Sequence, residues 1–349
     1  MNASSLALSV DEFQLECLAT RQETPSARTY VFRMPPGWGQ FDPGQFLNFL
    51  FEIDGEEQLR SYSISSSALV RGLASITVKR VPGGRVSNWL FDQMRPGMKV
   101  RTSGPAGQFS CGLRPAGPLL LLTAGSGITP AASMLRSLAD QGTQTDAVLL
   151  HFASAPEEMI FAGEMQGWAR ALPRLRVIPV VTRPDHASGW VGPVGRLSRP
   201  MLQGLVPDLG SRTVYCCGPA GFMELAGTLV EGSGLPTDRF LTESFDRAVE
   251  EAPETGNESP GVPAYTCAFA KSGVVGAVSA DTTLLKAAKA VGVRIQSSCG
   301  KGICGTCRVR LVSGTVDLRH QGGIKQREID QGFILACCSR ATSDVVIDK

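Results

Sequence analysis

The spacing of four cysteines near the end of this 349-residue sequence limits most strongly what the chain can fold into. Cys299, Cys304 and Cys307 follow the pattern C-x4-C-x2-C, and Cys337 comes later, in the segment Ile334–Cys337. Thiolates are the soft ligands that hold iron–sulfur clusters, and this spacing with a distant fourth cysteine is the plant-type pattern for a [2Fe–2S] cluster. The pattern therefore predicts a cluster domain at this end of the chain.

Glycines within the cysteine loop support this prediction. Gly300, Gly302 and Gly305 allow positive φ and close backbone approach, so that amide N–H groups can point at the sulfur atoms. A zinc site is the alternative interpretation. Zinc sites usually combine two short C-x2–4-C pairs, however, and only one pair in this sequence has that spacing.

The length predicts two or three domains, each large enough to bury its own core. Hydrophobic residues make up 43% and charged residues 19% of the chain, as in ordinary soluble globular proteins. The apolar runs stay well short of the roughly 18 residues that span a bilayer. Residues 1–20 lack the layout of a signal peptide. We therefore expect a cytoplasmic protein without membrane insertion, whose ten cysteines are reduced thiols or metal ligands.

Charge is distributed unevenly along the chain. Residues 263–349 contain 12 Lys and Arg against 6 Asp and Glu, a net charge of +6, so the rest of the chain carries −4 of the overall +2. A basic C-terminal region favours docking on an acidic protein surface, because complementary charge steers encounter. An ordinary solvated surface explains the excess equally well. The basic residues are scattered and no nucleic-acid recognition motif accompanies them, so we expect no nucleic acid partner.

Two further regions and a linker precede the cluster region. Residues 13–109 contain short β runs separated by Pro and Gly turns, which predicts a small antiparallel β-barrel. From residue 118, apolar strands alternate with helical patterns, as in βαβ units around a parallel sheet. Residues 246–262 are acidic and lack an apolar period, which indicates a linker. The predicted domains are a barrel over residues 1–114, an α/β domain over 115–245 and a cluster domain over 263–349.

Three helices can be placed from apolar periodicity and capping residues. In the α/β region, helices are expected over Ala131–Ala139 and around Glu157–Arg170. In the cluster region, Asp281 is the expected N-cap of a helix and Gly292 the residue that ends it.

Two segments of the barrel region are suited to binding a flat, phosphorylated cofactor. Arg60, Tyr62 and Ser63 lie on one predicted strand, where a guanidinium can pair a phosphate, an aromatic ring can stack and a hydroxyl can bond a ring nitrogen. In Gly83–Leu90 a glycine turn enters a helix with a serine to cap it, so free N–H groups can bind a second phosphate. Taken singly, each segment is also compatible with an ordinary half-buried strand or capped helix.

Two segments of the α/β region follow apolar strands. In Thr123–Pro130, strand, glycine loop and helix N-terminus form a phosphate cradle of the kind found in nucleotide-binding sheets. The loop lacks the full G-x-G-x-x-G pattern, so alone it is a weak indication. In Val214–Met223, Cys217 is expected at a strand end, facing the same crevice. A cysteine packed in the core is the alternative interpretation.

Taken in order, the motifs R-x-Y-S, G-x-V-S-N, G-x-G-I-T-P, C-G-P and the cysteine pattern resemble the ferredoxin–NADP reductase superfamily fused to a C-terminal plant-type ferredoxin. The resemblance covers nearly the whole chain. It implies a flavin-binding antiparallel β-barrel, a parallel-sheet α/β nucleotide domain and an α+β ferredoxin domain of β-grasp type. It also implies an NAD(P)H-dependent oxidoreductase with FAD and a [2Fe–2S] cluster as cofactors.

The resemblance assigns a role to each motif residue. The residues expected at the reacting centre are Tyr62, Ser63, Cys217, Glu243 and Phe245. Those expected to bind the flavin are Arg60, Tyr62, Ser63, Gly84, Val86 and Ser87. Those expected to bind the nicotinamide dinucleotide are Gly125, Gly127, Thr129, Pro130, Gly218 and Pro219. The expected cluster ligands are Cys299, Cys304, Cys307 and Cys337. In this scheme Glu243 and Phe245 close the flavin pocket.

The choice of cofactors rests on two local observations. The G-x-V-S-N segment is similar to the FAD-binding branch of the superfamily rather than to its FMN-binding branch. A 2′-phosphate would require an Arg or Lys after the second strand of the sheet, and His151–Glu158 contains none, so NADH is expected. Arg170 or Arg183 could still supply the charge that NADPH needs.

The segment Cys299–Arg340, with Arg319–Ile324 and Ala336–Arg340 within it, is most similar to reductase subunits of Rieske-type monooxygenases that demethylate quaternary amines such as glycine betaine. The resemblance thus implies an oxygenase subunit as electron acceptor, docking near the basic ferredoxin domain. Reductases of hybrid-cluster proteins or of other hydroxylases are alternatives. A redox sensor without turnover is less well supported, because flavin and nucleotide motifs would be superfluous to it. Hydride transfer needs no general acid or base, so His151, His186 and His320 are expected to be structural or exposed.

Overall fold

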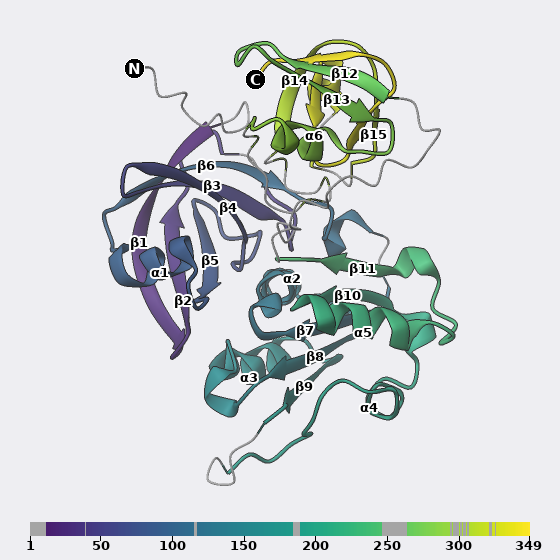
Figure 1. Ribbon diagram of the computed structural model, residues 1–349. Coiled ribbons are helices and arrows are strands. Elements are labelled where there is room, and N and C mark those ends of the chain that lie inside the picture. The colour runs from purple at the N-terminus through teal and green to yellow at the C-terminus, as the bar shows by residue number, and fades with distance from the viewer. Residues whose placement is uncertain are drawn as a thin grey trace.

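A computed structural model describes residues 12–38, 40–114, 117–183, 189–245, 264–293, 295, 300, 302, 305, 307–320, 323–324 and 326–349. Three main sheets organise this part of the chain, and Figure 1 shows them as a barrel, a helix-covered sheet and a small C-terminal unit. The predicted linker over 246–262 and the predicted ligands Cys299 and Cys304 lie outside the described residues. Among the helices that are described, none is both long and apolar enough to cross a bilayer.

The N-terminal sheet is an antiparallel barrel, as predicted. Its six strands run in the order β4-β3-β6-β1-β2-β5. It closes where Ile64 bridges Ile76 and the Ser65 N–H donates to the Ser75 carbonyl at 2.7 Å. Aromatic and aliphatic side chains from all six strands fill its interior, which is the burial that this strand pattern needs. The elements are β1 Glu12–Thr24, β2 Ala27–Arg33, β3 Phe46–Ile53, β4 Glu56–Ser63, β5 Leu73–Lys79, α1 Arg85–Gln93 and β6 Lys99–Ala106.

The second sheet is parallel throughout, which confirms the βαβ prediction. Its strands run in the order β11-β10-β7-β8-β9. The leucines of β7 alternate between two cores: Leu121 packs on the side of α2 and α3, and Leu120 and Leu122 pack on the side of α4 and α5. The elements are β7 Leu119–Ala124, α2 Ile128–Asp140, β8 Ala147–Ala153, α3 Ala162–Ala171, β9 Leu175–Val181, α4 Arg199–Leu205, β10 Thr213–Cys217, α5 Ala220–Val230 and β11 Phe240–Glu243.

The helix expected around Glu157–Arg170 begins later than predicted. A short 3-10 turn covers Pro156–Glu158, and α3 starts only at Ala162. Phe161, the residue before it, has a φ of 62° and therefore interrupts any continuous right-handed helix through this segment. The apolar residues of the segment, Met159 to Phe161 between the turn and α3 and Met165 and Trp168 within α3, are all buried in one core, which explains why the sequence reads as a single apolar period.

The C-terminal unit combines a five-stranded mixed sheet, in the order β13-β12-β18-β14-β16, with a two-stranded ribbon of β15 and β17. Helix α6 packs against this unit and buries Leu284 and Ala288 in its core. The elements are β12 Ala264–Phe269, β13 Val274–Ser279, α6 Leu284–Ala290, β14 Arg308–Ser313, β15 Val316–Leu318, α7 Gln326–Asp330, β16 Phe333–Leu335, β17 Ser339–Ala341 and β18 Val345–Ile347.

The predicted N-cap of α6 is wrong. Thr283 occupies the N-cap, and its hydroxyl accepts a hydrogen bond from the Lys286 N–H at 3.4 Å. Asp281 lies in the preceding turn, where its own N–H donates to the Ser279 hydroxyl. Both residue types are good N-caps, so composition alone could not choose between them. Gly292, with a φ of 78°, follows the helix as predicted.

Helix α2 joins the barrel to the parallel sheet through polar contacts. The Ser133 hydroxyl donates to the Ser66 carbonyl at 2.8 Å, and the Ala68 N–H donates to the Ser137 hydroxyl at 2.9 Å. These bonds hold the segment that follows β4 along the surface of α2. They therefore fix how the barrel strand β4 approaches the sheet.

Arg136 is the charged centre of this junction. Its guanidinium donates to the Ser65 carbonyl of the barrel and forms an ion pair with Glu164 of α3 at 2.7 Å. It also lies over the Phe161 ring, 4.5 Å from the centroid. Only 17% of the Arg136 side chain is exposed, so these partners replace much of the water it would otherwise bind.

Replacing Arg136 should destabilise the junction between barrel and sheet. Arg136→Met keeps much of the side-chain volume but leaves the Ser65 carbonyl and the Glu164 carboxylate with one donor fewer. We expect the thermal unfolding midpoint to fall by about 5 °C, measured by calorimetry. Arg170→Met is the matched control on α3, because Arg170 is exposed. Equal midpoints for the two variants would contradict the role given to Arg136.

Candidate functional site

A row of residues crosses the parallel sheet near the carboxyl ends of its strands. Glu243 of β11 pairs with Cys217 of β10, Cys217 with Thr123 of β7, and Thr123 with His151 of β8. Residues in register on parallel strands point to the same face of a sheet. Ser63, the last residue of β4, reaches this row from the barrel, because its hydroxyl donates to Glu243 Oε2 at 3.1 Å. The structure thus brings together Ser63, Cys217 and Glu243.

The carboxyl group of Glu243 is buried and only partly satisfied. Its Oε1 atom has no hydrogen-bond partner among the described residues. Burial raises the pKa of Glu243 to about 8, while the hydrogen bond from Ser63 acts in the opposite direction. The carboxyl is therefore neutral near pH 7. A neutral carboxyl offers both a donor and an acceptor to a group that binds beside it.

Gly107 is the part of this site that the sequence analysis missed. A Cβ placed on Gly107 would lie 3.0 Å from the Phe46 ring and 3.9 Å from Glu243 Oε1, and the φ of Gly107 is 108°. Glycine is therefore required here by the Phe46 ring and by the backbone conformation, at a position that borders the free carboxyl oxygen. Glycines are common in turns, so nothing in the sequence separates this one from the others.

Tyr62 lies half-buried on β4 and packs on the barrel core. Its ring centroid lies 6.0 Å from that of Phe49 and 6.4 Å from that of Phe51. Burial raises the pKa of the Tyr62 phenol, so it stays protonated. An aromatic ring that is held from behind and partly open in front can stack on a flat ligand.

Arg60 lies on the same strand and keeps its guanidinium close to its own backbone. Its Nη1 donates to the Leu59 carbonyl at 2.6 Å and its Nη2 to Gln58 Oε1 at 3.2 Å. Neither partner is a charged group, so the guanidinium remains available to an anion.

The start of helix α1 offers unpaired N–H groups, although not in the way predicted. Gly84 is the N-cap, and the described residues supply no side-chain cap to it. Ser87 does not cap the helix, because its hydroxyl accepts from the Val81 N–H at 3.2 Å and faces the Gly84 carbonyl. Val86 is buried, so only its backbone can meet a ligand. The helix dipole and the uncapped N–H groups together suit a phosphate.

The two glycine loops of the parallel sheet lie in contact. A Cβ on Gly127 would lie 2.1 Å from the Cys217 carbonyl oxygen, and one on Gly218 would lie 3.0 Å from the Ala124 Cβ. Only glycine fits this approach of the loop after β7 to the end of β10. Gly127 is also the N-cap of α2, again without a side-chain cap among the described residues. The 3-10 turn Gly125–Gly127 leads directly into α2, and the Ile128 N–H is bonded to the Gly125 and Ser126 carbonyls, so the N–H groups without a side-chain cap are those at the start of this turn, where a phosphate group can bind.

Other predicted residues of this region differ in their surroundings. The Thr129 hydroxyl donates to the Ser126 carbonyl at 2.9 Å and so closes the loop. Pro130 is buried in α2, whereas Pro219 is exposed at the N-cap of α5. Phe245 is 42% exposed and lies two residues beyond Glu243.

His151 is structural, as expected. It is fully buried, and its Nδ1 lies 2.8 Å from the Thr123 hydroxyl. Burial lowers the pKa of His151 to about 3, so the imidazole is neutral. His186 lies outside the described residues.

Arg183 lies closer to the end of β8 than its place in the sequence indicates. Its N–H donates to the Ser154 carbonyl at 3.0 Å, and its side chain is exposed. The segment after β8 contains Glu157 and Glu158 but no basic residue. Arg183 is therefore the basic residue to consider for a 2′-phosphate.

At the other end of the chain, backbone N–H groups point at cysteine sulfurs. The Gly302 N–H donates to Cys337 Sγ at 3.2 Å, and the Cys337 N–H donates to Cys307 Sγ at 3.4 Å. Gly302 has a φ of 70°, a conformation that few other residues adopt. Cys307 and Cys337 are both buried. Among the described residues no three His, Cys, Asp or Glu side chains gather as a metal site.

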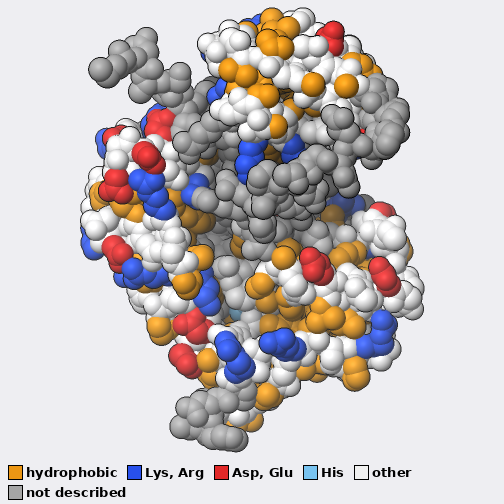
Figure 2. Space-filling view, viewed as in Figure 1, with side chains coloured by type: hydrophobic (Ala, Val, Ile, Leu, Met, Phe, Trp, Pro, Cys, Tyr) orange, Lys and Arg blue, Asp and Glu red, His pale blue; other side chains and the backbone are white. Residues whose placement is uncertain are grey.

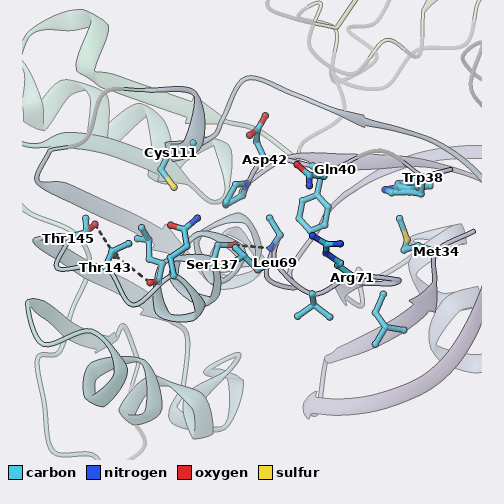
Figure 3. A pocket seen from close by; sticks show the side chains of 18 of the residues that line it. Met34, Trp38, Gln40, Asp42, Leu69, Arg71, Cys111, Ser137, Thr143 and Thr145 are labelled. Carbon is cyan, nitrogen blue, oxygen red and sulfur yellow. Dashed lines mark hydrogen bonds between the residues drawn. The ribbon is translucent and has the colours of Figure 1, made fainter. Parts of the chain in front are cut away.

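A separate cavity of about 940 Å³ lies between the barrel and the amino ends of strands β7 and β8. Figure 3 shows Trp38 and Arg71 of the barrel across from Thr143 and Thr145. Thr145 comes just before the amino end of β8, so the cavity lies away from the glycine loops. Of the described residues that line it, none was predicted to bind flavin or nucleotide. Burial raises the pKa of the Cys111 thiol there to about 11, so this cysteine stays protonated.

Comparison with known proteins decides the family. Models of the oxidoreductase FAD-binding domain, the oxidoreductase NAD-binding domain and the 2Fe-2S iron-sulfur cluster binding domain match residues 15–111, 121–227 and 270–342, respectively. The chain is 38% identical over 345 residues to the glycine betaine monooxygenase reductase subunit of Pseudomonas aeruginosa, covering 96% of this chain and 94% of that protein. The chain belongs to the ferredoxin reductase-type flavin and NAD reductases that carry a [2Fe–2S] domain.

A second relative agrees with this family, and a solved structure shares the fold. The stachydrine N-demethylase reductase subunit of Rhizobium meliloti is 37% identical over 343 residues, covering 97% of each chain. The solved structure of phthalate dioxygenase reductase aligns with a TM-score of 0.59 at 24% identity, covering 97% of this chain and 98% of that one. The latter likeness concerns the fold alone.

The residues present fit the cofactors of this reductase family. On the flavin side, the orphaned Glu243 oxygen, the half-open Tyr62 ring and the uncapped start of α1 offer complementary groups. On the cluster side, N–H groups already point at two cysteine sulfurs, as an iron–sulfur site requires. The protein is thus an NAD(P)H-dependent flavin and iron–sulfur oxidoreductase with FAD and [2Fe–2S] as its cofactors.

The unusual pKa of Glu243 gives a pH test of the flavin-free protein. A pKa near 8 lies above the ordinary value of 4.5, so the neutral carboxyl favours the folded state at low pH. This contribution is lost as the pH rises from 4.5 to about 8. Other titrating groups act equally on both proteins, so we expect the thermal midpoint of the wild-type protein to fall over this window relative to that of Glu243→Gln, which cannot ionise. Parallel pH profiles would contradict the raised pKa.

Proposed function

We propose that this reductase passes electrons from NADH through FAD and a [2Fe–2S] cluster to a Rieske-type oxygenase subunit that demethylates a quaternary amine. The single observation that carries the electron path is the meeting of Ser63, Cys217 and Glu243 between barrel and sheet, in a chain that also aims N–H groups at two sulfurs. The nature of the acceptor is supported by the relatives, which are named as reductase subunits of glycine betaine monooxygenase and stachydrine N-demethylase.

The residues of the barrel side would bind and orient the flavin. Arg60 and the start of α1, with Gly84, Val86 and Ser87, would hold its phosphates. Tyr62 would stack on the ring system, and Ser63 would hydrogen-bond its edge. When bound, the flavin accepts two electrons from the nicotinamide and releases them singly to the cluster.

The residues of the sheet side would bind the nucleotide and close the reacting centre. Gly125, Gly127, Thr129 and Pro130 would cradle its pyrophosphate, and Gly218 and Pro219 would border it. Cys217 would lie at the nicotinamide, where its side chain fixes how closely the ring approaches. Glu243 would hold a proton at its carboxyl beside the flavin, and Phe245 would exclude water.

NADH is the proposed electron donor. The segment after β8 carries Glu157 and Glu158, whose negative charge opposes a 2′-phosphate. Glu158 is engaged by Lys79 in an ion pair at 3.0 Å, which leaves Glu157 as the exposed acid of the pair. Arg183, whose N–H is bonded to the segment after β8, is the alternative contact for a 2′-phosphate.

The acceptor is proposed to dock near the ferredoxin unit, which carries a charge of +6 over residues 263–349. Arg319 contributes to the surface next to the segment of Cys337 and Cys338, since its backbone N–H donates to the Cys338 carbonyl and 71% of its side chain is exposed. The face of this unit seen in Figure 2 is largely uncharged. A partner guided by charge would therefore approach another side. The whole chain is proposed to work in the reducing cytoplasm.

A chain truncated after Arg247 tests the division into an NADH-oxidising part over residues 1–245 and a delivering part over residues 263–349. It should oxidise NADH with ferricyanide at a rate near that of the full chain, because Ser63, Cys217 and Glu243 are retained. It should fail to reduce the oxygenase subunit of the Pseudomonas aeruginosa glycine betaine monooxygenase, which the full chain should reduce. The assay is oxygen uptake in the presence of glycine betaine. Loss of both activities would contradict the division, and equal rates with NADPH would contradict the coenzyme choice.

Two neighbouring cysteines distinguish the proposed ligand set, Cys299, Cys304, Cys307 and Cys337, from a general need for thiols. Cys337→Ser should abolish the EPR signal of the reduced [2Fe–2S] cluster, because a hydroxyl is a poor ligand for iron in this setting. Cys338→Ser should retain the signal, because Cys338 is not in the ligand pattern. Flavin content, read from the visible spectrum, should be equal in both variants. A signal that survives in Cys337→Ser would remove this residue from the ligand set.

A further inference from the structure

A buried ion pair lies directly beside one of the proposed cluster ligands. Arg308, the residue after Cys307, binds the Glu328 carboxylate through its Nη1. Only 13% of the Arg308 side chain and 9% of the Glu328 side chain are exposed. The Arg308 guanidinium also lies over the Phe333 ring, 5.2 Å from its centroid. Such a pair is costly to desolvate and is therefore weak evidence for stability alone.

The pair joins the two chain segments that carry Cys307 and Cys337. Arg308 begins β14 and pairs in register with Leu335 of β16. Glu328 belongs to α7, which leads through β16 to Cys337. Where the two segments meet, the Ala336 N–H donates to the Cys307 carbonyl at 3.0 Å. A shift of either segment would change the spacing between the two sulfurs.

We infer that Arg308 and Glu328 are positioning residues for the iron–sulfur cluster, which hold the Cys307 and Cys337 segments together and balance charge beside it. The inference rests on the proposed ligand set. Its geometric part follows from the contacts of the pair with α7, β14 and β16. Its electrostatic part follows because reduction adds a negative charge to the cluster, and net charge near a cluster sets its potential.

The electrostatic part separates this role from simple packing. Glu328→Gln removes the negative member of the pair and makes the surroundings of the cluster more positive, which favours the reduced cluster and raises its potential. Arg308→Met removes the positive member and lowers the potential. A residue that served packing alone would move the potential in the same direction in both variants, or not at all. The double variant, neutral at both positions, should return toward the wild-type potential.

The experiment measures cluster potential by EPR at pH 8 and cluster loss by visible absorbance in the presence of an iron chelator, using the full chain. We expect Glu328→Gln to have the higher potential of the two single variants, with the wild-type protein between them. Both should lose the cluster at least about tenfold faster than wild type, because each removes the buried ion pair that joins the Cys307 and Cys337 segments. Arg308→Lys keeps the charge, so its potential should stay at the wild-type value even if its cluster is lost faster.

Arg310→Met is the matched control. Arg310 lies two residues along the same strand, opposite Phe333, but its side chain is exposed. It should match wild type in both measurements. Equal potentials in Glu328→Gln and Arg308→Met, or an Arg310→Met variant that behaves as they do, would overturn the inference. A wild-type protein without a [2Fe–2S] signal would instead contradict the proposed ligand set.

Discussion

The hydrogen bond between Ser63 and Glu243 is the contact on which the proposed reacting centre depends. It connects the end of a barrel strand to the end of an edge strand of the parallel sheet, two elements that have no local reason to meet. Glu243 is buried where the barrel strand meets it, and its raised pKa is a consequence of that burial. The docking of barrel on sheet is in turn held by polar bonds from α2, in which Arg136 and two serines hold the segment after β4. The chemistry of one carboxyl thus depends on an interface built elsewhere.

Much of this fold could be predicted from the sequence because its elements bury strong apolar patterns. The leucine run of β7 lies between two helical layers, so every leucine is buried, and the run could only be a central strand. The polar details were harder. Ser87 and Asp281 are good capping residues, but Ser87 bonds the preceding turn and Thr283 replaces Asp281. Capping is decided by the local backbone path, which residue type alone does not fix.

The candidate site was open to sequence reasoning only in part. Motif resemblance named Ser63 and Glu243 separately, whereas their contact spans 180 residues and follows from tertiary packing. Spacing alone could not reveal Gly107, because it is required by the close approach of the Phe46 ring, a tertiary contact beside the Glu243 carboxyl. The ion pair of Arg308 and Glu328 was equally hidden, since charged residues on a strand and a short helix normally face solvent. What sequence patterns miss here are the buried polar partners.

The row that crosses the sheet would place neutral side chains around the proposed reacting centre. His151 and Glu243 are the two titratable members of the row whose pKa values are strongly moved by burial, to about 3 and about 8. Between these values the imidazole and the carboxyl are both neutral. Transfer of a hydride between two bound cofactors requires no proton donor or acceptor in the same step, and a neutral surrounding keeps charge repulsion from changing with pH. Burial, rather than a set of ionised catalytic residues, therefore prepares this centre for electron transfer.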